Sequence, residues 1–104
     1  MNSKKEIIFK GKEAINIQLQ GVKKLQKSLN EDFYKAVELL LSLKGKLILS
    51  GIGKSGHIAN KIASTFTSTG IVSLFLHPVE ASHGDLGIIE KKDIVILISN
   101  SGEA

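Results

Sequence analysis

The sequence predicts an α/β fold, a three-layer domain with a parallel sheet that is preceded by two helices. Three patterns lead to this prediction. Apolar residues recur at helical spacing over residues 1–45, short apolar runs alternate with helical segments over residues 46–104, and polar or glycine-rich loops follow those runs. Strands that alternate with helices form parallel sheets with right-handed crossovers. We therefore expect a helical segment over residues 1–45 and an α/β part over residues 46–104.

The first helix is predicted over Lys4–Leu29. Its apolar stripe recurs every seven residues and consists of Ile8, Ile15, Val22 and Leu29, with Lys, Gln and Glu on the opposite face. Such a stripe suits a partner helix in a homo-oligomer, or it covers the chain's own sheet. The sequence leaves both readings in place.

The second helix is predicted to begin after Asn30, a residue type that caps helix N-termini. Gly45 is the expected C-cap. The apolar residues of its expected buried face are Phe33, Val37, Leu40 and Leu41. Both ends and one face of this helix can thus be compared with the structure.

The α/β part begins with a strand over residues 47–49. A helix over residues 55–69 follows and ends at Gly70. A second strand covers residues 71–76, one or two helical turns lie within residues 78–86, and a third strand covers residues 93–98. The third strand, DIVILI, is apolar without interruption, which is typical of a strand buried on both faces. Three strands leave a sheet edge open, so we expect an incomplete sheet and a fragment of a longer protein.

Composition narrows the functional classes. The chain of 104 residues allows one small domain, and its 42% hydrophobic and 23% charged content is ordinary for a globular protein. It contains four Phe, one Tyr and no Trp, which makes base stacking an unexpected function. The net charge of +4 is mild and its lysines suit solvated helix faces. We therefore expect no nucleic-acid partner.

The chain contains no cysteine, which excludes disulfides and thiolate metal sites. The N-terminal residues MNSKKEIIFKGKE lack the apolar core of a signal peptide. The longest apolar runs are far shorter than the roughly 20 residues that span a bilayer. The expectation is a cytoplasmic protein with no membrane partner.

The loop SGIGKSGH, residues 50–57, matches G-x-G-x-x-G. A P-loop would need glycine where Ile48 stands, so a nucleoside triphosphate site is excluded. A dinucleotide site would need an acid at the end of the second strand, and the first acid there is Glu80, beyond a proline. The remaining readings are a loop for another phosphate, with Lys54 and Ser55 beside it, or a tight turn without a ligand.

The loop after the third expected strand reads SNSGE. Ser99, Asn100 and Ser101 are neutral hydrogen-bond donors at the end of a strand, where a parallel sheet binds ligands. Such a group suits the terminal oxygens of a phosphate monoester. The alternative is a serine N-cap supported by Glu103.

The middle loop holds His77, Glu80, His83 and Asp85. Imidazoles and carboxylates near a strand end can transfer protons or bind a metal ion. The spacing of the two histidines is not a strong metal signature, and a structural role is the alternative. His57 lies one turn into a predicted helix and is interpreted as a packing or capping residue.

Three blocks together, SGIGKSGHIANKIASTFTSTG, HPVEASHGDLG and ISNSGE, resemble the sugar isomerase (SIS) domains of the arabinose-5-phosphate isomerases. The resemblance implies the flavodoxin-like SIS topology and a sugar-phosphate ligand. It also implies reversible conversion of D-ribulose 5-phosphate to D-arabinose 5-phosphate through an enediol, which feeds lipopolysaccharide biosynthesis. Sites between the subunits of a homo-oligomer are implied as well.

The resemblance also implies roles for individual residues. Ser55, Ser99, Asn100 and Ser101 would bind the phosphate of the substrate. Lys54 would be catalytic, neutralising developing oxyanion charge. His83 would be catalytic too, in contact with the sugar near the reacting carbons.

Three further residues match positions that the family uses. His77 matches a position associated with substrate and with zinc, where zinc is inhibitory rather than required. No cofactor is therefore expected. Gly70 and Ile71 match a turn that contacts substrate across a dimer.

Two departures from the family pattern matter. Ala104 stands where many SIS domains have Thr, and the family's catalytic glutamates and a further histidine would follow residue 104. The remaining strands of the sheet and the tandem CBS modules are absent. We therefore expect the 104 residues to be inactive alone. The alternatives are a SIS module that senses a sugar phosphate without catalysis and a non-functional truncated remnant.

Overall fold

The computed structural model describes residues 3–102, without the side chains of residues 85 and 86. The chain divides into two compact units between residues 37 and 38. Helices α1 (Lys4–Ser28) and α2 (Glu31–Leu41) form where the sequence predicts them. Ser3 caps α1 by accepting from the Glu6 N–H at 3.2 Å, and the Asn30 side chain accepts from the Asp32 N–H at 2.9 Å. The predicted role of Asn30 is confirmed.

The apolar faces of these helices are largely uncovered. No residue of α1 is buried, and Ile15 of its stripe is 70% exposed. In α2, the predicted buried face is wrong for Phe33, Val37 and Leu41, which are all exposed. Leu40 is partly buried and packs on the core of the second unit. The reason is that the best covered face of the sheet is already occupied by another helix.

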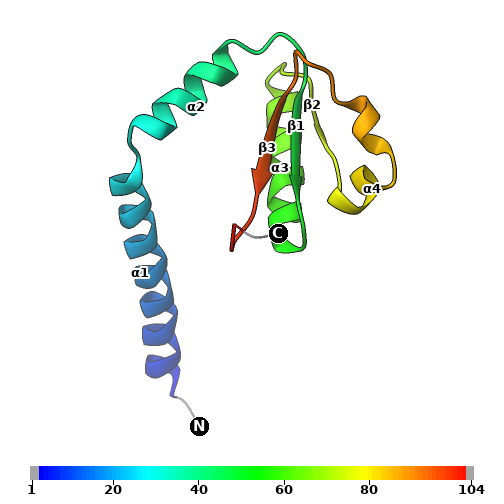
Figure 1. Cartoon of the computed structure of the whole chain (residues 1–104). Helices are drawn as coiled ribbons and strands as arrows, with labels where there is room; N and C mark the ends of the chain where they lie inside the picture. The colour runs from blue at the N-terminus through cyan, green and yellow to red at the C-terminus, as the bar shows by residue number, and fades with distance from the viewer. Residues whose placement is uncertain (1–2, 103–104) are drawn as a thin grey trace. The chain divides into compact units, whose positions relative to one another are not determined.

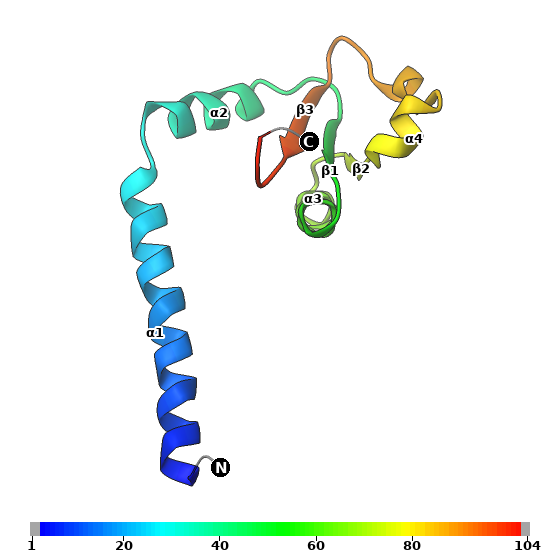
Figure 2. The same cartoon turned by 60° about the horizontal axis from the view of Figure 1, so that its bottom comes forward.

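The second unit contains a three-stranded parallel sheet, as predicted. Its strands are β1 (Leu47–Gly51), β2 (Ser73–Phe75) and β3 (Ile94–Ile98), in the order β2-β1-β3. Helix α3 (Lys54–Ser68) connects β1 to β2 and lies on one side of the sheet (Figures 1 and 2). Helix α4 (Pro78–Ser82) and a 3-10 turn (Asp85–Ile88) connect β2 to β3. This is the mixed α/β fold with an open sheet that the sequence predicts.

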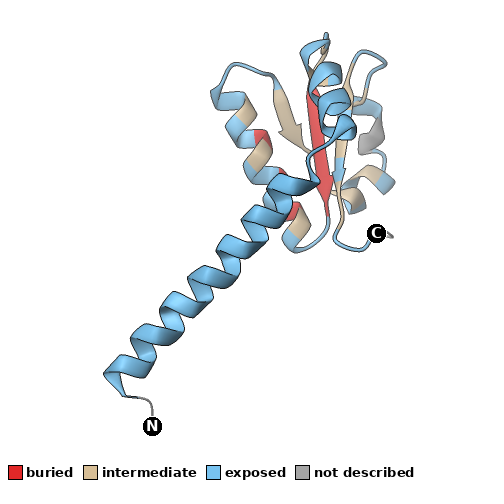
Figure 3. Cartoon of the chain, turned by 90° about the vertical axis from the view of Figure 1, so that its left-hand side faces the viewer, coloured by how far each residue is buried: buried red, intermediate tan, exposed pale blue. Residues whose placement is uncertain are grey.

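The core lies between β1 and α3. All residues of the central strand β1 are buried, and they form the continuous red element in Figure 3. Leu47 and Leu49 pack against Ala59 and Ala63 of α3. Two alanines let the helix backbone approach the sheet closely, which explains why they are buried while Ile58 is 54% exposed. The alternate residues of β1 face the other side of the sheet.

Strand β3 differs from its prediction. Ile94, Ile96 and Ile98 pack against the core beside β1, but Val95 is 40% exposed and Leu97 is 76% exposed. The expectation of burial on both faces is therefore wrong for this strand. The reason is its position, because β3 is an edge strand and α3 covers only one of its faces.

At the amino edge of the sheet, Asp93 joins the starts of β1 and β3. Its carboxylate accepts from the Lys46 N–H at 2.9 Å, the Lys46 Nζ at 2.6 Å and the Glu90 N–H at 2.7 Å. These bonds, led by the Lys46 side chain, lower the pKa of Asp93 to about 2. Gly45, the expected C-cap, lies three residues beyond the end of α2. It belongs to this cluster, since a Cβ there would collide with the Asp93 carboxylate.

Candidate functional site

The glycine loop places the first turn of α3 at the carboxyl edge of the sheet. Gly53 has φ 63° and ψ −129°, a backbone conformation that side chains disfavour. A Cβ on Gly56 would lie 2.6 Å from the Gly51 carbonyl oxygen. Glycine at these positions therefore allows a sharp turn and close packing of α3 on β1.

The start of α3 offers unused hydrogen-bond donors. The Gly56 N–H bonds to the Ile52 carbonyl and the His57 N–H bonds to the Gly53 carbonyl. Within residues 3–102, the backbone N–H groups of Lys54 and Ser55 have no acceptor. The first turn of α3 also contains no acidic residue. The positive end of this helix is thus open to an anion.

One pocket of about 260 Å³ gathers the predicted phosphate ligands. Its lining residues are Ile52, Ser55, Ile98, Ser99, Asn100 and Ser101, and we call it the serine pocket. The pairing of Gly51 with Ile98 brings the ends of β1 and β3 side by side, which explains how the two loops meet. Ser99 Oγ accepts from the Gly102 N–H at 2.9 Å, so its hydroxyl proton is available to donate.

A second pocket of about 300 Å³ also borders the glycine loop. Its lining residues are Gly51, Gly53, Gly56, His57, Asn60, Phe75 and His77, and we call it the histidine pocket. His77 also begins α4, where its Nδ1 accepts from the Val79 N–H at 3.1 Å. The His77 ring meets the Phe75 ring edge-on, with centroids 6.2 Å apart.

Sequence reasoning missed two members of the histidine pocket. It interpreted His57 as a packing or capping residue and did not single out Asn60. Both are exposed residues of α3. Their three-residue spacing immediately after the glycine loop puts them on one helix face, which is the signal that could have identified them.

The other predicted site residues lie apart from these pockets. Lys54 is the first residue of α3 and is exposed beside the loop. His83 is the C-cap of α4, is exposed, and lines neither the serine nor the histidine pocket. Gly70 and Ile71 follow the far end of α3, a helix about 22 Å long. Glu103 and Ala104 lie outside the described residues.

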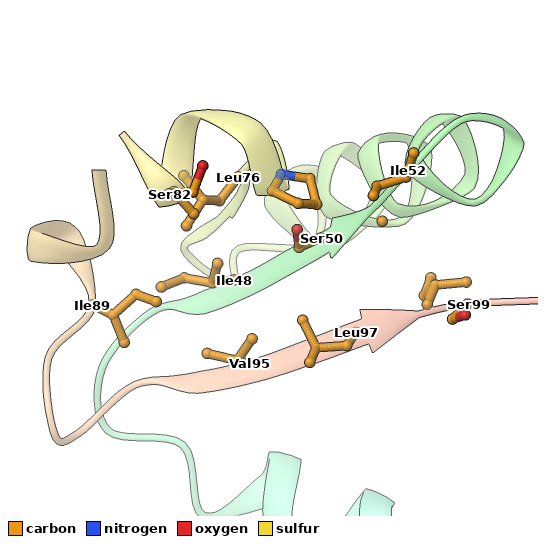
Figure 4. Close-up of a pocket in the computed structure, with 13 residues that line it drawn as sticks. Ile48, Ser50, Ile52, Leu76, Ser82, Ile89, Val95, Leu97 and Ser99 are labelled. Atoms are coloured by element: carbon orange, nitrogen blue, oxygen red, sulfur yellow. The ribbon is translucent and has the colours of Figure 1, made fainter. Parts of the chain in front are cut away.

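A third pocket, of about 500 Å³, lies on the sheet face opposite α3 (Figure 4). Ile48 and Ser50 of β1, Val95 and Leu97 of β3, and Pro78 and Ala81 of α4 are among its lining residues. Charged side chains are missing from its lining, and its walls are mainly aliphatic. This apolar pocket is therefore a poor match for a phosphate group.

Metal and membrane features are limited in the described part of the chain. Within residues 3–102, side chains of residues 85 and 86 excepted, no three His, Asp or Glu residues gather in a group that could hold a metal ion. Among the described helices, none has the length and apolar content needed to cross a membrane.

Comparison with known proteins places this geometry in a family. The SIS domain family matches residues 40–104. The arabinose 5-phosphate isomerase KdsD of Yersinia pestis is 52% identical over 94 residues, covering 90% of this chain and 29% of that protein. The arabinose 5-phosphate isomerase GutQ of Escherichia coli K12 is 48% identical over 94 residues, with the same coverage.

A solved structure gives the same result. An Escherichia coli CFT073 protein, solved in complex with a ligand, superposes with a TM-score of 0.91 at 44% identity, over 99% of this chain and 55% of that one. The chain therefore belongs to the SIS domain family, and its relatives include arabinose 5-phosphate isomerases. It spans 29% of the length of those curated relatives.

Proposed function

We propose that this chain forms the phosphate-binding part of an arabinose 5-phosphate isomerase. The observation that carries the proposal is the serine pocket, where Ser55, Ser99, Asn100 and Ser101 meet beside the open N-terminus of α3. Hydroxyl, amide and backbone N–H donors suit a phosphate monoester. The abbreviated name of the ligand in the Escherichia coli CFT073 structure agrees with arabinose 5-phosphate, the compound in the curated relatives' names.

The proposed reaction interconverts D-ribulose 5-phosphate and D-arabinose 5-phosphate in the cytoplasm, for lipopolysaccharide biosynthesis. A base moves a proton between C1 and C2, and the developing enediolate needs positive charge near its oxygens. Lys54 begins α3 next to both pockets and supplies that charge in the proposal. His83 keeps its proposed contact with the sugar on the resemblance alone.

We further propose that the 104 residues bind sugar phosphate without turning it over. Neither the serine pocket nor the histidine pocket is lined by a carboxylate that could act as base. The same observation favours a second candidate, a SIS module that senses sugar phosphate. The oligomeric site is also a proposal, supported by Gly70 and Ile71, which lie too far along α3 to join the pockets of their own subunit.

A chimera separates the two candidates. This chain replaces the matching residues of Yersinia pestis KdsD, and isomerase activity is measured together with that of the isolated chain. We expect an active chimera and an inactive isolated chain. Lys54→Ala should lower kcat of the chimera about 100-fold or more, while Lys61→Ala, on the same helix, should not. An inactive but folded chimera would contradict the enzyme proposal, and turnover by the isolated chain would contradict its inactivity.

A further inference from the structure

His77 is both a pocket residue and the N-cap of α4. Its backbone is extended, with φ −71° and ψ 131°, and its Nδ1 accepts from the Val79 N–H at 3.1 Å. Pro78, between them, has no N–H. The Val79 N–H is therefore the first donor of α4 that needs a partner, and the His77 ring supplies it.

This hydrogen bond selects one form of the imidazole. A nitrogen that accepts a hydrogen bond carries no proton, and a neutral imidazole has one proton to place. The proton of His77 must then be on Nε2, which becomes a donor. The imidazolium form would have N–H groups on both nitrogens and would lose the bond to Val79. The cap of α4 thus holds His77 as a neutral donor.

The donor of His77 is available to a ligand. The ring is half-buried, contacts Phe75 edge-on and lines the histidine pocket with His57 and Asn60. Within residues 3–102, the one hydrogen bond of the His77 ring is made by Nδ1, which leaves Nε2 without a partner. A ligand oxygen in the histidine pocket can accept from it, while a phosphate occupies the adjoining serine pocket.

The same tautomer does not fit the zinc that the family resemblance implies at His77. A metal ion binds a nitrogen lone pair, and at Nε2 this would move the proton to Nδ1, facing the Val79 N–H. At Nδ1, the ion would displace that N–H directly. Either way α4 loses its cap. Residues 3–102 also offer no group of three His, Asp or Glu side chains to share the ion, the side chains of residues 85 and 86 not being described.

We propose that His77 meets the ligand as an Nε2–H donor, and that its imidazole holds no zinc while α4 keeps its N-cap. The donor role rests on the proposed function, because it needs the oxygen of a sugar phosphate. The tautomer and its conflict with zinc rest only on the bond between His77 and Val79.

Nitrogen NMR of the full chain with labelled histidine tests the tautomer. Long-range proton–nitrogen correlations, assigned with His77→Asn, should show the proton of His77 on Nε2. With Zn²⁺ alone, the His77 signals should either stay unchanged or move together with the Val79 amide as its hydrogen exchange accelerates. A proton on Nδ1 in the free chain would overturn the proposal. So would Zn²⁺ bound to His77 with the Val79 amide still protected.

Two variants separate the cap from the donor. In His77→Asn, the side-chain oxygen can cap Val79 but no donor reaches the position of Nε2. In His77→Gln, the amide nitrogen reaches that position but the cap is lost. Affinity for arabinose 5-phosphate should fall about tenfold in His77→Asn and less in His77→Gln.

Equal affinity of wild type and His77→Asn would overturn the donor role. If the wild-type chain binds no arabinose 5-phosphate at all, the proposed function fails and the donor role fails with it. The NMR result then still decides the tautomer and the zinc conflict, since neither measurement uses the sugar phosphate.

Discussion

Gly56 lies so close to Gly51 that a Cβ on Gly56 would be 2.6 Å from the Gly51 carbonyl oxygen. This contact sets the first turn of α3 directly on the end of β1. The serine pocket and the histidine pocket both include residues from this turn or loop. The shape of both pockets therefore depends on a hydrogen atom at position 56.

Gly56→Ala should destabilise the chain by about 1–3 kcal/mol, because the added methyl group forces α3 away from β1. Urea unfolding monitored by circular dichroism measures the change. Gly21→Ala is the matched control, since a Cβ there meets nothing within 4 Å and α1 gains helix propensity. An unchanged urea midpoint for Gly56→Ala would contradict the close contact.

Asp93 should make stability depend on acid. Its carboxyl has a pKa of about 2 in the folded chain, lowered chiefly by the hydrogen bond from Lys46, against about 3.9 when unfolded. A lowered pKa stabilises the fold above the unfolded value, and the contribution is lost as pH falls from about 4 to 2. Urea midpoints between pH 2 and 6 should show this loss in the wild type and not in Asp93→Asn.

Glu90→Gln is the control for the acid experiment. The Glu90 side chain is 60% exposed and lies 3.8 Å from Lys46, whereas its backbone N–H, which the substitution keeps, bonds to Asp93. The variant should keep the wild-type loss of stability below pH 4. Loss of the acid dependence in Glu90→Gln rather than in Asp93→Asn would assign it to the wrong carboxylate.

The two faces of the sheet should respond differently to truncation. Leu49 is fully buried against α3, so Leu49→Ala should cost about 2–5 kcal/mol of stability. Leu97 is 76% exposed on the opposite face, and Leu97→Ala should change stability by no more than about 0.5 kcal/mol. Comparable losses in both variants would mean that the face bearing Leu97 is covered in solution.

Ser55→Ala should weaken binding of arabinose 5-phosphate by about fivefold to tenfold, because one donor to the phosphate is lost. Isothermal titration calorimetry measures the affinity. Ser68→Ala, at the far end of α3, removes a hydroxyl that bonds only the Thr65 carbonyl and should leave the affinity unchanged. Equal effects of the two substitutions would place the phosphate outside the serine pocket.

Local chemistry explains which features could be predicted from the sequence. Gly53 and Gly70, with φ of 63° and 94°, mark turns that favour glycine, and Asn30 caps α2 with its own side chain. Parallel pairing of β1 with β3 then brings Ser55 and Ser99 to one edge. Each of these follows from residues close in sequence or from a general rule for parallel sheets.

The features that the sequence did not predict depend on tertiary cover. Apolar spacing identifies one face of α2, but it does not say whether anything covers Phe33. An uninterrupted apolar run suits a strand with two covered faces, yet β3 is an edge strand and Leu97 is exposed. His57 and Asn60 became recognisable only when α3 was placed beside the end of β2.

The central claim is that the serine pocket binds the phosphate of a pentose 5-phosphate. Titration of the nitrogen-labelled chain with arabinose 5-phosphate, followed by amide chemical shifts, tests it most directly. We predict saturable shifts concentrated at Lys54, Ser55 and residues 99–101, with inorganic phosphate competing for the same amides. Saturable binding that leaves these amides unmoved, or no binding at millimolar ligand, would contradict the account.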